Sequence, residues 1–131
     1  MDIIKPYMNL ATLSLSRQRD LVQSKQETAS ELAEACYRQI ERFNPVLNAF
    51  ITVIPPNKQE SPLPANPPLS GIPIAVKDLY HTKGILTTAG SKFFANHVPS
   101  EDAFVVSKIK KAGAQIVGKT NTHEIALGVT N

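Results

Sequence analysis

An apolar run that ends in a lysine constrains this chain more than any other feature. Residues 71–78 read G-I-P-I-A-V-K-D, with no charge before Lys77. Such a run is typical of a strand buried on both faces, and Pro73, which cannot donate to a ladder, favours a sheet edge. A lysine that loses hydration at the strand end can act as a general base. Because most lysines are solvated, this segment alone favours an ordinary exposed lysine.

Proline and glycine divide the chain into three parts. Six of the ten prolines fall within residues 55–68, and all six glycines lie at position 71 or later. A proline-rich stretch favours an exposed, partly extended conformation. We therefore predict a helical segment with one strand over residues 1–54, a linker over 55–69, and a strand-and-helix unit over 70–131.

Composition narrows the functional classes. The chain has 131 residues, the length of one domain, and a net charge of +3 that is spread along the sequence. Without a dense basic block, direct nucleic-acid binding is not expected. The single cysteine, Cys36, and the lack of a secretory signal after Met1 favour a cytoplasmic protein. No apolar stretch has the length of a membrane span, so no membrane association is expected.

The front third is predicted to be helical. A short helix is expected over residues 16–24. A second should begin at Thr28, where Glu31 completes a capping box, and end at Pro45. The apolar face of this helix is expected to comprise Leu32, Cys36, Ile40 and Phe43. Cys36 is therefore interpreted as a packing residue, and residues 48–53 are predicted to form a strand.

The back half is predicted to alternate strands with helices. After the lysine strand, the small residues 87–91 allow close backbone approach. A helix is expected after Pro99, with Ser100 as N-cap and Gly113 just beyond its end. Its apolar face is predicted to contain Val105, Ile109 and Ala112. Residues 114–117 should form a buried strand, and Asn121 with Glu124 suggests one more helix.

Three other patterns suggest different chemistry. Residues 113–120 spell G-x-x-x-x-G-K-T, the phosphate-loop pattern of nucleotide binders, but a helix precedes the first glycine and a strand-like run fills the loop. Ser107 and Lys110 have the S-x-x-K spacing of some acyl enzymes, on a solvated helix face. The histidines lack metal-ligand spacing, and they are His81, His97 and His123. Coincidence is the better account of each pattern, with the nucleotide binder as the alternative from another class.

Several ordered motifs resemble the N-terminal part of amidase signature enzymes. They are the segments 71–78, 82–84, 87–92, 101–103 and 118–121, together with Glu124. The resemblance runs from the front helices to Asn131 and is densest from Leu69 onward. It implies an α/β fold with a mixed sheet flanked by helices, of which this chain would hold an incomplete, N-terminal portion.

The resemblance also implies a chemistry. Members of this family hydrolyse amide bonds with a Ser–Ser–Lys triad, and Lys77 aligns with the catalytic lysine. Gly128 is a weaker candidate for lining the substrate pocket. No metal or cofactor is implied, and the substrate would be a small-molecule amide. The A subunit of glutamyl-tRNA(Gln) amidotransferase resembles this stretch too and is the alternative within the family, the one case in which nucleic acid would be involved.

Both family serines belong to a glycine- and serine-rich segment that this sequence does not contain. The 131-residue chain is therefore expected to be a truncated, N-terminal piece that is inactive alone, since Lys77 has no nucleophile to activate. Apolar strand edges left uncovered would favour self-association. A non-catalytic interaction module is the remaining interpretation of the isolated chain. The Pro-rich segment at 55–69 also departs from relatives that carry a longer helical insert.

Overall fold

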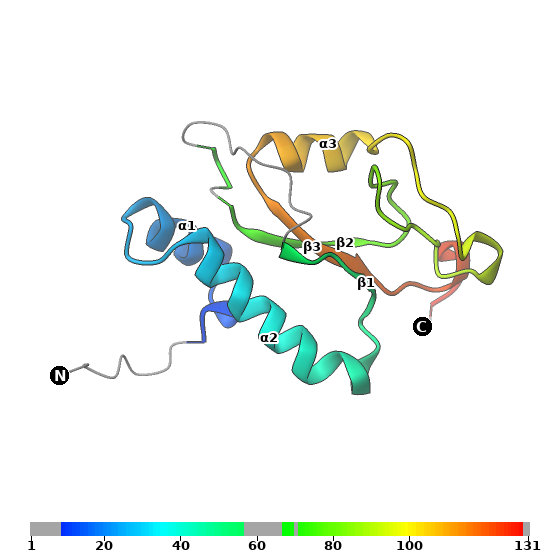
Figure 1. The fold of residues 1–131 in the computed structure, drawn as a ribbon, viewed down its shortest axis with the longest axis horizontal. Coiled ribbons are helices and arrows are strands. Elements are labelled where there is room, and N and C mark those ends of the chain that lie inside the picture. Colours follow the sequence, from blue (N-terminus) through cyan, green and yellow to red (C-terminus); the bar gives the residue numbers. More distant parts are fainter. Residues whose placement is uncertain (1–8, 57–66, 70, 130–131) are drawn as a thin grey trace.

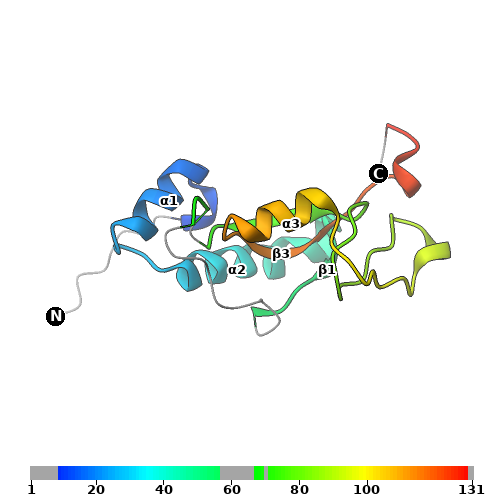
Figure 2. The same cartoon turned by 90° about the horizontal axis from the view of Figure 1, so that it is seen from above.

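In the computed structural model, a three-stranded sheet lies between helices (Figure 1). The structure describes residues 9–56, 67–69 and 71–129. Within these ranges the elements in chain order are η1 (Leu10–Thr12), α1 (Leu15–Gln23), α2 (Ala29–Leu47), β1 (Phe50–Val53), β2 (Pro73–Lys77), η3 (Lys92–Phe94), α3 (Phe104–Lys111), β3 (Gln115–Thr120) and η4 (Glu124–Ala126). Helix α2 lies on one side of the sheet and α3 on the other, an arrangement that Figure 2 shows from above. The predicted α/β class is confirmed.

The N-terminal helices begin where capping residues satisfy their free N–H groups. Ser14 caps α1 by accepting from the Arg17 N–H. The predicted capping box of α2 is confirmed, since Thr28 accepts from the Glu31 N–H and the Glu31 carboxylate accepts from the Thr28 N–H. Because such caps pair donors that have no partner within the helix, the start of α2 follows directly from the sequence.

The end of α2 differs from the prediction. The helix does not stop at Pro45 but continues to Leu47, and its C-cap Asn48 adopts a left-handed conformation with φ of 51°. A proline so close to the end removes only one helical hydrogen bond, and the Asn48 N–H still reaches the Asn44 carbonyl at 2.8 Å. The predicted apolar face is also only partly covered. Leu32 is buried, whereas Phe43 is 42% exposed.

Cys36 lies on this partly covered face, and burial raises the pKa of its thiol above the ordinary value. A raised pKa leaves less thiolate, the reactive species, at neutral pH. We therefore expect Cys36 to react with iodoacetamide several-fold more slowly in the folded chain than in the chain unfolded in urea. Equal rates in the two states, measured by mass spectrometry at pH 8, would contradict the packing role assigned to this residue.

The sheet is mixed, with β3 at its centre and the order β1-β3-β2. Strand β1 pairs with β3 antiparallel, and β2 pairs with β3 parallel, with α3 in the connection between them. Among the described residues β2 is an edge strand that begins at Pro73, as its sequence predicts. The expected burial on both faces is wrong. Val76 is buried against Val106 of α3, but Ala75 and Lys77, whose side chains alternate to the opposite face, are exposed.

Helix α3 covers one face of the sheet through a single fully buried residue. Val106 has no exposed surface and packs with Ile54, Val76 and Ile116 in the core cluster. The predicted face is only partly right, since Val105 is 42% exposed whereas Ile109 and Ala112 are half-buried. Ser100 is not the N-cap either. The helix starts after Ala103, which forms no side-chain cap.

Three predictions concern the chain after α3. Gly113 follows α3 with φ of 87°, which confirms the predicted C′ glycine. The strand predicted at residues 114–117 is observed one residue later and extends to Thr120. The prediction of a helix from Asn121 is wrong. Only the short η4 forms, with Ile125 in a non-helical conformation, because the Glu124 carboxylate accepts a hydrogen bond from Ser91 instead of capping a helix.

The linker predicted over residues 55–69 falls largely on positions outside the described ranges. At its two described ends, Pro55 and Pro56 are exposed and the Leu69 N–H donates to the Ala112 carbonyl. None of the helices in the described ranges is both long and apolar enough to cross a lipid bilayer.

Candidate functional site

Lys77 occupies the last position of β2, opposite Thr120 at the end of β3. Its side chain is exposed. The parallel pairing brings the carboxyl ends of β2 and β3 to the same edge of the sheet, where the chain segments 78–91 and 121–128 continue from them. In sheets of this kind, ligands bind outside the carboxyl ends of parallel strands. This edge is therefore the candidate site.

The residue after Lys77 is the first fixed point of the site. Asp78 is fully buried, and its Oδ2 accepts hydrogen bonds from the Thr88 N–H at 2.9 Å and the Thr88 hydroxyl at 2.6 Å. Its main chain is held as well, because the Asp78 N–H donates to the Thr120 carbonyl and its carbonyl accepts from the Ala89 N–H. Asp78 thus ties the returning loop to the ends of both parallel strands.

A buried lysine supplies the opposite charge. The side chain of Lys119 has no exposed surface, and its Nζ lies 3.5 Å from Oδ1 of Asp78. The ammonium group donates to the Tyr80 carbonyl at 2.8 Å and to the Thr87 hydroxyl at 2.7 Å. Burial lowers the pKa of Lys119 below its ordinary value, and the Asp78 carboxylate opposes this shift.

The sequence patterns did not reveal the place of Lys119. It is the lysine of the phosphate-loop pattern, and treating that pattern as coincidence left the residue without a role. The geometry agrees that it holds no phosphate, because residues 115–120 form the central strand and Lys119 is fully buried in the protein. The sequence carried no usable signal for it, because the strand predicted at residues 114–117 ends before Lys119, whereas the observed β3 extends to Thr120.

Polar atoms without a hydrogen-bond partner occur in the segments at the same edge. Among the described residues, the buried side-chain atoms without a hydrogen bond include Oγ1 of Thr122, Nδ1 of His123 and Oδ1 of Asp78, which has only the ion pair with Lys119, while a fourth, Nε of Arg19, lies in α1. Native proteins leave few such atoms, so a local group of them marks a place with a role beyond packing.

The backbone around these atoms is strained. Ala89, Ile125 and Ala126 all have positive φ, between 52° and 58°. A β-branched residue such as Ile125 rarely adopts this conformation, and strain of this kind collects at functional sites. The Ile125 N–H donates to the Ala89 carbonyl, so the two strained segments support each other. The expected close approach at residues 87–91 is confirmed at Gly90, where an added Cβ would lie 2.6 Å from the Thr122 carbonyl oxygen.

Gly128 lies at the end of this segment. Its φ is 151°, and a Cβ added there would overlap the ring of His123. The lack of a side chain at position 128 is therefore used within the chain itself, to make room for an imidazole. The segments that carry the two family candidates, Lys77 and Gly128, belong to or follow β2 and β3, whose carboxyl ends lie side by side.

The other sequence patterns are not assembled into sites. Lys110 pairs with Asp102 at 3.0 Å, as a lysine on a helix surface does. The rings of His81 and His97 lie 5.3 Å apart, but the described residues contain no group of three or more potential metal ligands. The unexpected contact between these two imidazoles joins loops that the sequence keeps apart.

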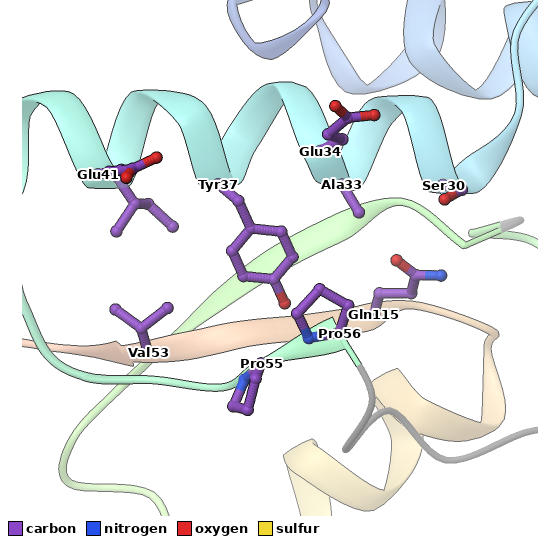
Figure 3. Close-up of a pocket in the computed structure, with 10 residues that line it drawn as sticks. Ser30, Ala33, Glu34, Tyr37, Glu41, Val53, Pro55, Pro56 and Gln115 are labelled. Atoms are coloured by element: carbon purple, nitrogen blue, oxygen red, sulfur yellow. The ribbon is translucent and has the colours of Figure 1, made fainter.

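A separate cavity of about 830 Å³ lies between α2 and the β1 side of the sheet. Figure 3 shows the Tyr37 ring projecting from α2 into this space, with Val53 and Pro55 facing it and Glu34 and Glu41 on the helix above. The Tyr37 hydroxyl donates to the Ile54 carbonyl at 2.6 Å, so the ring bridges helix and strand. Mostly apolar atoms line the cavity, and neither Lys77 nor Lys119 of the candidate site is among its lining residues.

Comparison of the sequence with known proteins shows which family the chain resembles. Residues 31–131 match the family model described as Amidase. The A subunit of glutamyl-tRNA(Gln) amidotransferase from Desulfatibacillum aliphaticivorans is 39% identical over 129 residues, which are 92% of this chain and 27% of the relative. The corresponding protein from Aromatoleum aromaticum is 43% identical over 126 residues, 90% of this chain and 26% of the relative. The chain thus spans about a quarter of the length of these curated relatives.

Solved structures agree with the sequence relatives. The A subunit of the glutamyl-tRNA(Gln) amidotransferase of Thermotoga maritima superposes with a TM-score of 0.75 at 32% identity, covering 92% of this chain and 25% of that one. A 6-aminohexanoate cyclic dimer hydrolase superposes with a TM-score of 0.74 at 26% identity, covering 86% of this chain and 24% of that one. The described fold therefore corresponds to about a quarter of each of these larger proteins.

Proposed function

This chain belongs to the amidase family, and we propose that it contributes Lys77, the base of a Ser–Ser–Lys triad that hydrolyses carbon–nitrogen amide bonds. The observation that carries the proposal is the position of Lys77. It is the last residue of β2, it is exposed, and it leaves the sheet at the edge where unpaired polar atoms and strained backbone collect. A single cysteine and curated relatives of the amidotransferase type support a cytoplasmic location.

In this mechanism Lys77 exchanges a proton with a bridging serine, and that serine takes the proton of a nucleophilic serine. The nucleophile attacks the amide carbonyl, the amine departs with a proton, and an acyl-enzyme remains until water cleaves it. Backbone N–H groups stabilise the oxyanion. Both serines would come from polypeptide outside these 131 residues. Gly128 is proposed to line the pocket for a small-molecule amide, and the mechanism uses neither a metal nor a cofactor.

A second candidate within the family is a role as part of the A subunit of a glutamyl-tRNA(Gln) amidotransferase. It is favoured by the identity of 39–43% to proteins of that name. In this case the ammonia released from the amide would be transferred rather than lost, and the protein would work with the other subunits of that enzyme and with tRNA.

One experiment separates these candidates. The polypeptide translated from the whole reading frame is purified and assayed for ammonia release from a panel of amides that includes glutamine, with and without glutamyl-tRNA. An amidase should act on its amide without tRNA, whereas a component of an amidotransferase should favour glutamine and respond to glutamyl-tRNA. If a polypeptide that contains the serine pair released ammonia from none of these amides, the proposed function would be wrong.

We expect the 131-residue chain to have no amidase activity when purified alone. A nucleophile must lie within hydrogen-bond reach of its base, roughly 2.6–3.2 Å. The Ser91 hydroxyl instead donates a hydrogen bond to the Glu124 carboxylate. The assay compares this chain with its Lys77→Ala variant on the same amides. Turnover that disappears with the substitution would show that a serine of this chain serves as the nucleophile, contrary to the proposal.

A further inference from the structure

We propose that the buried pair of Lys119 and Asp78 positions Lys77, by fixing the turn through which the chain leaves β2. This inference rests on the proposed function, because Lys77 must be the catalytic base for its position to matter. Neither Lys119 nor Asp78 is expected to touch the substrate, since both side chains have no exposed surface. They are positioning residues.

The first step of the argument is the cost of burying these charges. An ammonium or a carboxylate loses several kcal/mol of hydration when it enters a protein interior, and a pair recovers this only with good geometry and further hydrogen bonds. Here the pair is not tight, since Nζ and Oδ1 are 3.5 Å apart. An apolar pair of similar volume would stabilise the fold at least as well in many proteins. The pair therefore calls for an explanation other than stability.

The second step is what the two side chains hold. Lys119 donates to the Tyr80 carbonyl and the Thr87 hydroxyl, and Asp78 accepts from the Thr88 N–H and hydroxyl. All four groups belong to the loop that begins directly after Lys77. Lys119 binds this loop near its start, at Tyr80. Both side chains bind it again near its end, Lys119 at Thr87 and Asp78 at Thr88. The hydrogen bonds of the pair are thus concentrated on the one segment that follows the candidate base.

The third step links this loop to Lys77. The Tyr80 N–H donates to the Lys77 carbonyl at 3.1 Å, while the Tyr80 carbonyl accepts from Lys119. The main chain between residues 77 and 80 is thus fixed at both ends. Because the Lys77 side chain is exposed rather than packed in the core, the direction of its Cα–Cβ bond depends on its backbone, which is held by the pairing with β3 before it and by this turn after it. A catalytic group misplaced by about 1 Å can lose about 10²-fold in rate.

The test uses the polypeptide from the whole reading frame and four variants. Lys119→Met keeps the length of the side chain but removes its donors, and it leaves the Asp78 carboxylate buried without a countercharge. Lys119→Met combined with Asp78→Asn removes both charges and so relieves that penalty. Lys110→Met is the matched control, because it removes a lysine from a half-buried ion pair on α3. Lys77→Ala reports on the proposed function.

We expect kcat to fall at least tenfold in Lys119→Met and in the double variant, with KM within about twofold of the parent, since a displaced base impairs chemistry and not binding. The double variant should regain thermal stability relative to Lys119→Met but not kcat. Amide hydrogen exchange at Thr88 and Ala89 should accelerate in both. Lys110→Met should leave kcat unchanged.

Other outcomes would overturn the inference. A purely structural pair predicts that kcat returns together with stability in the double variant, and this result would refute the positioning role. Unchanged exchange at Thr88 and Ala89 in a folded variant would refute it as well. The two proposals fail separately. Full activity in Lys77→Ala removes the proposed function, whereas an inactive Lys77→Ala beside a fully active double variant removes only the positioning role.

Discussion

Replacing Lys77 with alanine should reduce amide turnover by at least about 10³-fold, because residues of a catalytic triad act as a unit and the loss of one removes most of their joint effect. The fold should be retained. Lys77 is exposed at the end of an edge strand, and surface substitutions of this kind usually change stability by no more than about 0.5 kcal/mol. Steady-state kinetics of the polypeptide from the whole reading frame and its thermal unfolding measure the two effects.

Two further variants make this result specific. Lys83→Ala removes another exposed lysine from the loop that follows β2, and its backbone N–H can still donate to Asp102. It should retain activity. Lys77→Arg keeps the positive charge, but a guanidinium does not give up its proton at working pH, so this variant should be as inactive as Lys77→Ala. An active Lys77→Arg would mean that position 77 supplies charge rather than proton transfer.

The parts of the fold that follow from local chemistry could be predicted from sequence. The capping box at Thr28 and Glu31 fixes the start of α2, and Gly113 fixes the end of α3, because each depends on groups within a few residues. The edge strand β2 could be predicted for the same reason, from a short apolar run that contains a proline near its start.

The errors occurred where distant residues compete with local signals. Asn121 and Glu124 have the spacing of a helix cap, but Glu124 accepts a hydrogen bond from Ser91, which is 33 residues earlier in the chain. Asp102 was expected at the start of a helix, yet it accepts from the Lys83 N–H and pairs with Lys110. These partners are adjacent only in the folded chain, so sequence spacing could not reveal them.

The candidate site was predictable in part. Lys77 was identified from motifs that resemble a family, and the apolar run alone favoured an ordinary surface lysine. Lys119 was missed because its role depends on Asp78, Tyr80 and Thr87, which the parallel pairing of β2 and β3 brings around it. A single sequence offers no register between strands that are far apart. The strand predicted from the sequence also ended at residue 117, so Lys119 was not recognised as part of the sheet.

The second large effect is expected at Gly118, a residue of the central strand that pairs with both neighbouring strands. This residue lies in β3, opposite Ala75 of β2 and Val53 of β1. A Cβ added there would lie 2.6 Å from the Thr52 carbonyl oxygen and 2.7 Å from the Phe50 ring. The ring could rotate away, but the carbonyl belongs to the neighbouring strand and can move only with it. Gly118→Ala should therefore push β1 from the sheet.

Overpacking of a buried site usually costs about 1–3 kcal/mol and occasionally more, and we place Gly118→Ala at or above about 3 kcal/mol because the first contact is backbone. Urea unfolding of the 131-residue chain, followed by circular dichroism, measures this loss. Gly84→Ala is the control. Gly84 has φ of +70° but nothing within 4 Å of an added Cβ. The substitution there should therefore cost only about 1–2 kcal/mol, the penalty for placing a residue with a side chain in a left-handed conformation. Equal losses at the two positions would show that the close approach of β1 to Gly118 is not what makes a glycine necessary there.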